Sequence, residues 1–180
     1  MKLLIFLFWG FFVCASSASA EPSLEELRLK TAYLEKICRF ISWPDNCLQK
    51  GEPFRLAVMV QPRFYKVLTG FFKERTIQKH PVSVQVYPFE SSLDSCHLLL
   101  VDSTLASTFF KFAPVDNPNL LVIGDYPNAA HKGAHIGFKP MQNRYHLELN
   151  LPASRVLNLE FETLFFDYVD MIKKKWELGK

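Results

Sequence analysis

The residues whose spacing best fits metal chemistry are two histidines four positions apart. His131 and His135 form an H-x-x-x-H pattern, which on a helix puts both imidazoles on one face. Here Gly133 lies between them and an alternating, strand-like run follows. A zinc or copper site would also need His97 or His146 from distant segments. The pattern favours solvated loop and strand histidines, so we predict no metal ligands.

Patterns for nucleophilic catalysis and for phosphate binding are missing. The chain has no Gly-x-Ser-x-Gly sequence, the turn that exposes a hydrolase serine. Cys96 and His97 are adjacent, but neighbours on a strand point to opposite faces. The apolar run 54–60 leads into Gln61-Pro62, whereas phosphate cradling needs a glycine-rich turn. We therefore expect no catalytic residues and no cofactor.

The first twenty residues have the three-part plan of a secretory signal. Lys2 precedes an apolar run at 3–13, and small residues precede Glu21. The run is too short to span a bilayer, so we predict a signal peptide at 1–20 and a soluble, exported mature chain at 21–180. A lipoprotein anchor at Cys14 is the alternative, which the bulky residue before it disfavours.

Export changes the interpretation of three cysteines, because oxidising compartments allow disulfides. Cys38 falls on the apolar stripe of a predicted helix, so we expect a buried thiol that packs as a small hydrophobe. Cys47 lies in a predicted loop and Cys96 at the mouth of a predicted strand. We predict a disulfide between Cys47 and Cys96, which only geometry can decide.

Length and charge indicate one domain without a nucleic acid partner. Removing the signal leaves about 160 residues, enough for one domain with a real core. The formal charge of +3 falls to about +2 without Lys2, and the only basic run is 173–175. Such a run is typical of a solvated helix end. No later stretch is apolar enough to cross a membrane.

Apolar strands alternate with helices along the chain. Ser23 and Glu26 fit a capping box that starts a helix, and Pro44 ends it. Strands are predicted at 54–60, 82–87, 97–101 and 120–123, with helices from Pro62 and from Ser103 through Phe112. This order predicts an α/β, Rossmann-like three-layer fold: a mostly parallel sheet of about six strands, covered by helices on both faces.

The segment 133–151 combines two alternating runs with turn residues between them, Pro140, Gln142 and Asn143. It predicts an antiparallel hairpin with one apolar face. The next apolar positions, from Phe161 to Ile172, repeat at helical spacing, so we predict a final helix there.

Surplus aromatic residues are the strongest indication of a binding role. Adjacent pairs occur at 71–72, 109–110 and 165–166, and helical neighbours diverge by about 100 degrees, so one member of each can be exposed. Aromatic residues anchor interfaces; a broad core is the alternative. The predicted partner interface comprises Phe71, Phe72, Phe110, Phe166 and Trp176.

Several motifs resemble the YfiR type of exported bacterial proteins, including HmsC. The pattern Ala32-x-Leu34-x-x-Ile37-x-x-Phe40-x-x-Trp43-Pro44 is similar to the family's opening helix. Cys96-His97 before an apolar strand, and 133–138 with 146–151, resemble its third strand and its closing strands. Ser42 stands in place of the family's usual Glu, and Ala57 where some members have a cysteine that pairs with the residue matching Cys96.

The resemblance implies a periplasmic regulatory protein without catalysis. Its best-known members bind the periplasmic sensor domain of an inner-membrane diguanylate cyclase and repress it, which lowers cyclic di-GMP and biofilm formation, and members can form dimers. Two other functions remain as alternatives: a periplasmic small-molecule or metal binder with His131 and His135 near the site, and a hydrolase with Cys96 or a serine beside a histidine.

Overall fold

The first helix of the fold begins and ends where local chemistry sets its limits. The computed structural model describes residues 21–87, 93–107, 117–142 and 144–172; the predicted signal peptide lies outside them. Helix α1 (Leu24–Arg39) begins after Ser23, whose hydroxyl accepts the Glu26 amide at 3.1 Å. The chain then forms the short strand β1 (Ile41–Ser42), antiparallel to β9 (Glu160–Phe161).

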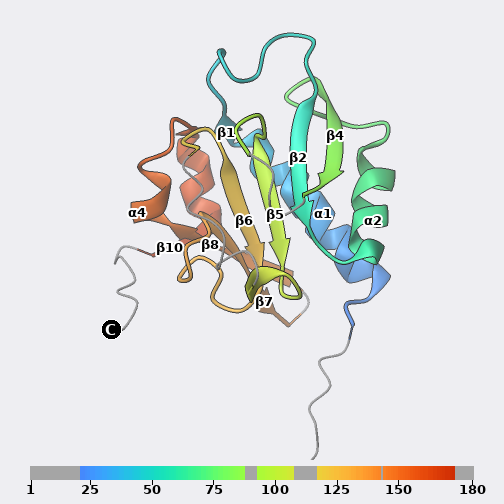
Figure 1. Ribbon diagram of the computed structural model, residues 1–180. Helices are drawn as coiled ribbons and strands as arrows, with labels where there is room; N and C mark the ends of the chain where they lie inside the picture. The colour runs from blue at the N-terminus through green and yellow to red at the C-terminus, as the bar shows by residue number, and fades with distance from the viewer. Residues whose placement is uncertain (1–20, 88–92, 108–116, 143, 173–180) are drawn as a thin grey trace, which may run out of the picture.

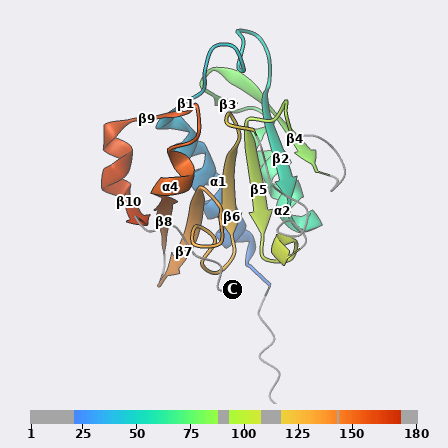
Figure 2. The same cartoon turned by 60° about the vertical axis from the view of Figure 1, so that its left-hand side comes forward.

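In the described residues the main sheet has eight strands, in the order β10-β8-β7-β6-β5-β2-β4-β3. The sequence predicted about six. Figure 2 shows most of the strands of this sheet side by side. The strands are β2 (Phe54–Met59), β3 (Thr76–Ile77), β4 (His80–Val86), β5 (Leu98–Asp102), β6 (Leu121–Asp125), β7 (Ile136–Met141), β8 (Arg144–Asn150) and β10 (Val169–Ile172). Among the strand pairs that the described residues form in this sheet, only β7–β8 and β3–β4 are antiparallel, so the predicted mostly parallel α/β sheet is confirmed.

Helices α1 and α2 (Pro62–Phe72) cover one face of this sheet (Figure 1). Their apolar side chains meet alternate residues of the strands, because successive strand residues point to opposite faces. This larger core contains Leu34, Ile37, Cys38, Phe64, Leu68, Phe54, Leu56, Leu98, Leu100, Leu121 and Ile123. Cys38 is fully buried in it, as predicted.

The opposite face holds a smaller core of Ala57, Met59, Leu99, Val101, Leu120 and Val122. Residues from two connections pack on it, around Ala106 and from Tyr126 to Ala134. In the segment predicted as a helix from Ser103 through Phe112, residues 103–105 form a turn and 106–107 are helical. The predicted residues from 108 onward lie outside the described ranges. Within those ranges, no helix is long and apolar enough to span a bilayer.

The end of the chain confirms one prediction and corrects another. Strands β7 and β8 form the predicted antiparallel hairpin, with Phe138 opposite Leu147. Pro140 lies within β7, beyond the part that pairs with β6, so its missing N–H interrupts no bond there. The predicted helix from Phe161 to Ile172 is wrong: a short helix, α4 (Leu151–Ser154), precedes β9, and a 3-10 helix, η1 (Thr163–Tyr168), leads into β10. Pairing with the outer edge of β8 outweighs the helical spacing.

Candidate functional site

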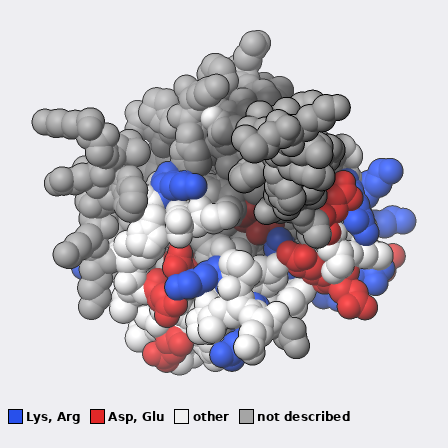
Figure 3. All heavy atoms as spheres, turned by 90° about the horizontal axis from the view of Figure 1, so that it is seen from below, with Lys and Arg blue, Asp and Glu red and all other residues white. Residues whose placement is uncertain are grey.

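A cleft of about 670 Å³ lies at the carboxyl ends of β2, β5 and β6. Open α/β sheets bind ligands at this edge. The amino-terminal ends of α1 and α2 and the β7–β8 hairpin complete its walls. Figure 3 views the molecule from this side, with acidic and basic atoms next to one another. The lining includes Glu21, Glu26, Leu27, Lys30, Arg63, Phe64, Asp102, Ser103, Asp125, Phe138, Lys139, Tyr145 and Glu148.

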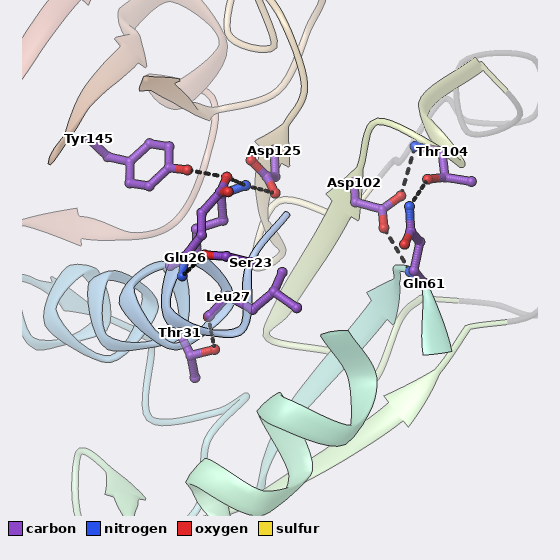
Figure 4. A network of polar contacts seen from close by, with 10 residues as sticks. Ser23, Glu26, Leu27, Thr31, Gln61, Asp102, Thr104, Asp125 and Tyr145 are labelled. Carbon is purple, nitrogen blue, oxygen red and sulfur yellow. Dashed lines mark hydrogen bonds and ion pairs between the residues drawn. The ribbon is translucent and has the colours of Figure 1, made fainter. Parts of the chain in front are cut away.

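A buried lysine lies at the centre of the cleft wall. Lys30, one turn after Glu26 on α1, has a side chain only 7% exposed. Its Nζ lies 2.9 Å from Glu26 Oε1 and 2.8 Å from Oδ2 of Asp125, which ends β6. The hydroxyl of Tyr145 donates to Glu26 Oε1 at 2.5 Å. Figure 4 shows Glu26 on α1, Asp125 at the end of β6 and Tyr145 on β8 pointing toward one another.

Glu26 and Asp125 share the single ammonium group of Lys30, and this sharing affects the pKa of each group in the network. Burial lowers the pKa of Lys30, but Asp125 and Glu26 more than offset it and raise that pKa. Burial raises the pKa of Asp125, and Lys30 offsets this only in part because Asp102 and Glu26 add negative charge nearby. Burial and the bond to Glu26 raise the pKa of Tyr145 to about 12. The network therefore contains a charged lysine and a neutral tyrosine at neutral pH.

Asp102 fixes the loops on the other side of the cleft. Its Oδ2 accepts the Gln61 amide at 2.7 Å, where α2 begins. Its Oδ1 accepts the amides of Thr104 at 2.9 Å and Leu105 at 3.3 Å. Asp102 pairs in register with Asp125 on the neighbouring strand, so two carboxylates end adjacent strands. Polar side chains held in this way are suited to binding a ligand.

The histidines considered for metal binding have structural partners. His135 donates its amide to the Val122 carbonyl at 3.0 Å, and its Nδ1 accepts the Val122 amide at 2.9 Å. His97 makes the same two bonds with Arg55, at 3.0 and 2.8 Å, and its Nε2 donates to the Cys47 carbonyl at 2.8 Å. His131 lines the cleft. The described residues contain no group of three or more His, Cys, Asp or Glu that could hold a metal.

Cys47 and Cys96 line one small pocket at the opposite, amino-terminal end of the strands. The structure has both as free thiols, and Cys47 Sγ donates to the Pro44 carbonyl at 3.1 Å. The disulfide is thus not formed in this structure, although the two residues lie around the same hollow. Burial raises the pKa of both thiols.

The aromatic residues predicted to contact a partner separate into three groups. Phe72 is only 2% exposed and belongs to the core, so its ring is inaccessible to a partner. Phe71 and Phe166 are half-buried, and the Phe71 ring contacts the Arg75 guanidinium. Phe110 and Trp176 lie outside the described residues.

Sequence reasoning missed three exposed apolar side chains in the segment 164–171. Leu164, Tyr168 and Met171 are 61%, 56% and 42% exposed; we call them the C-terminal edge surface. Tyr168 also lines a groove of about 280 Å³ with Lys36 of α1 and with Phe40, the residue that follows this helix. Reading this segment as one amphipathic helix concealed these residues, because that pattern placed Leu164 and Tyr168 on the buried stripe.

The cleft residues were also missed, although two signals were present. Glu26 and Lys30 are spaced i, i+4 on α1, and Asp102 and Asp125 each end an apolar strand. Strand-end acids meet at one edge of a parallel sheet. Nothing local indicated that Lys30 is buried, because this requires knowing where β6 and β8 lie.

Comparison with known proteins places the chain in a family. No curated protein matches the chain. The family model described as YfiR/HmsC-like matches residues 27–164, a range that contains most of α1, most of the main sheet and most of the cleft lining. This family is known for non-catalytic periplasmic regulators of diguanylate cyclase signalling. The chain belongs to the YfiR/HmsC-like family.

Proposed function

We propose that this chain is a periplasmic regulator that binds and represses the sensor domain of an inner-membrane diguanylate cyclase, and so lowers cyclic di-GMP and biofilm formation. The observation that carries this proposal is the family match over residues 27–164. In this proposal residues 1–20 are a cleaved signal peptide, residues 21–180 form one domain, and two copies can associate.

The C-terminal edge surface is our candidate contact region for the sensor domain. Leu164 and Tyr168 lie on the same six-residue 3-10 helix and are more than half exposed. Large apolar residues exposed close together are typical of interaction sites. The Lys36 ammonium lies 5.0 Å from the centre of the Tyr168 ring, so charge borders the apolar surface. Phe166 from the same 3-10 helix, and Phe71 on α2, remain predicted contacts.

Cyclic di-GMP measured in a deletion strain tests the proposal. We expect its concentration to rise on deletion and to return when the gene is supplied in trans. Supplying Tyr168→Ala or Leu164→Ala should leave the concentration high, because truncating an anchor residue commonly costs 2 kcal/mol or more of binding, roughly thirtyfold in affinity.

The matched control is Val86→Ala, because Val86 is 57% exposed and Tyr168 is 56% exposed. Val86 lies on β4, toward the edge of the sheet opposite β10. This control variant should restore repression fully, with all variants present at equal amounts on an immunoblot. An unchanged cyclic di-GMP concentration in the deletion strain would contradict the cyclase proposal. Equal repression by Tyr168→Ala, Leu164→Ala and Val86→Ala would exclude the C-terminal edge surface.

A further inference from the structure

We propose that the cleft at the carboxyl ends of β2, β5 and β6 binds a small organic molecule that joins a protonated amine to an apolar body. This proposal concerns a different region from the C-terminal edge surface. It does not depend on the partner suggested above.

The shape of the cleft is that of a small-molecule site. Its volume of about 670 Å³ is within the range of roughly 300–1,000 Å³ that is usual for ligand pockets. Its walls are rigid elements: α1, α2 and the ends of three neighbouring parallel strands. Lys30 and Asp102 are each 6% exposed and are held by the bonds described above, so the polar lining is already ordered before a ligand arrives.

The charges of the lining select a cation. Five carboxylates and three lysine or arginine side chains line the cleft, an excess of two negative charges among the side chains. The α-ammonium group of Glu21 reduces this excess to one once the predicted signal peptide is removed. The Lys139 ammonium forms an ion pair with the Glu148 carboxylate at 3.1 Å, and the Arg63 guanidinium lies 3.8 Å from the Glu21 carboxylate. Lys30 is shared by two carboxylates. A ligand ammonium would supply the charge that the lining lacks, whereas a ligand carboxylate or phosphate would be repelled.

Two other properties of the cleft lining, its metal-binding capacity and its apolar surface, restrict the class of ligand further. The described residues hold no metal-binding group of three or more suitable side chains, which favours an organic cation over a bare metal ion. Apolar surface comes from Leu27, Phe64, Phe138 and Tyr145. The Lys30 ammonium lies 5.2 Å from the centre of the Tyr145 ring, which shows that aromatic rings in this wall accept a cation at close range.

Isothermal titration calorimetry with matched compounds tests the proposal on the purified protein. Phenethylamine and tryptamine carry the amine, and phenethyl alcohol and tryptophol replace it with a hydroxyl on the same body. We expect the amines to bind roughly tenfold more tightly than the alcohols, and hydrocinnamate, an anion, to give no heat of binding.

A blocking variant locates the binding. Ser103 lines the cleft and is exposed, so Ser103→Trp should fill the space without removing any bond of the Lys30 network. Gln49→Trp, at an exposed position outside the cleft, is the matched control. Amine binding should be lost in Ser103→Trp and retained in Gln49→Trp, with both variants folded by circular dichroism.

Three results would overturn the proposal: no binding of either amine, equal affinity for amine and alcohol, or unchanged binding by Ser103→Trp. None of them bears on repression of the cyclase, because calorimetry reports only on the cleft. Likewise, failure of the cyclic di-GMP test leaves the calorimetric test intact.

Discussion

The ammonium of Lys30 lies 2.8 Å from the carboxylate of Asp125, and this ion pair joins the first helix to the end of a central strand. Both side chains are largely removed from water, at 7% and 13% exposure. Charges in such surroundings are tolerated when they are paired and hydrogen-bonded, and removing one partner leaves the other buried and uncompensated.

We therefore expect Lys30→Met to destabilise the fold by about 3 kcal/mol, near the lower end of the usual range for a broken buried pair, because Glu26 is partly exposed. Urea denaturation measures this loss. Lys66→Met, at an exposed position on α2, is the control and should change stability by less than about 0.5 kcal/mol. Equal effects of the two substitutions would show that the network adds no stability.

Acid should destabilise the protein through His135. Burial lowers the pKa of His135 to about 4, whereas the unfolded chain protonates its histidines near 6.5. Between these values the unfolded state binds more protons, so stability is full above the unfolded pKa and is lost as pH falls towards the folded pKa. This difference between the folded and unfolded pKa of His135 corresponds to roughly 3 kcal/mol of folding stability.

His135→Asn isolates this effect, because an amide oxygen can still accept the Val122 N–H that Nδ1 accepts now. The free energy of unfolding should depend less on pH in the variant than in the wild type between about pH 4 and 6.5. His97 contributes in the same direction, since burial lowers its pKa while Arg55 and Glu52 act on it with opposite signs. Identical pH dependence in variant and wild type would contradict the assignment to His135.

Replacing either of two glycines with alanine should change the stability of the protein, in opposite directions for the two positions. A Cβ at Gly124 in β6 would lie 2.5 Å from the Ala129 Cβ and 2.7 Å from the Tyr126 ring. Gly124→Ala should therefore cost about 1–3 kcal/mol through overpacking. A Cβ at Gly70 meets nothing within 4 Å on helix α2, so Gly70→Ala should stabilise by up to about 1 kcal/mol. Thermal unfolding of both variants measures the two changes in stability. If both variants were stabilised, or both destabilised, the prediction would be contradicted.

The three cysteines should differ in reactivity. Cys38 is fully buried, and burial raises its pKa, so native protein should not be alkylated there by iodoacetamide. Cys47 and Cys96 are partly exposed around one pocket and should react when reduced. Peptide mass spectrometry measures the labelling, and alkylation of Cys38 at the rate of Cys96 would indicate a looser core.

The same experiment without reductant tests the disulfide between Cys47 and Cys96. If exported protein contains it, both thiols resist alkylation and their peptides stay linked until reduced. Full labelling of both thiols would show that they remain free, as they are in the structure.

Much of the fold could be predicted from the sequence because its signals are local. Ser23 with Glu26 marks the start of α1, the apolar runs mark β2, β5 and β6, and the alternation in 133–151 marks the β7–β8 hairpin. Each pattern reports on backbone geometry within a few residues of itself. The family resemblance rests on the same motifs and their order, and the family match confirms it.

The candidate sites depended on tertiary structure, because contacts between distant segments create them. Lys30 appears in the sequence as a solvated helix charge, and only the positions of Asp125 and Tyr145 make it the centre of a buried network. Val169 to Ile172 fit a helical stripe, yet the unpaired edge of β8 takes them into the sheet as β10. A local period sets which side chains share a face, and the hydrogen-bonding needs of a distant strand then decide which secondary structure forms.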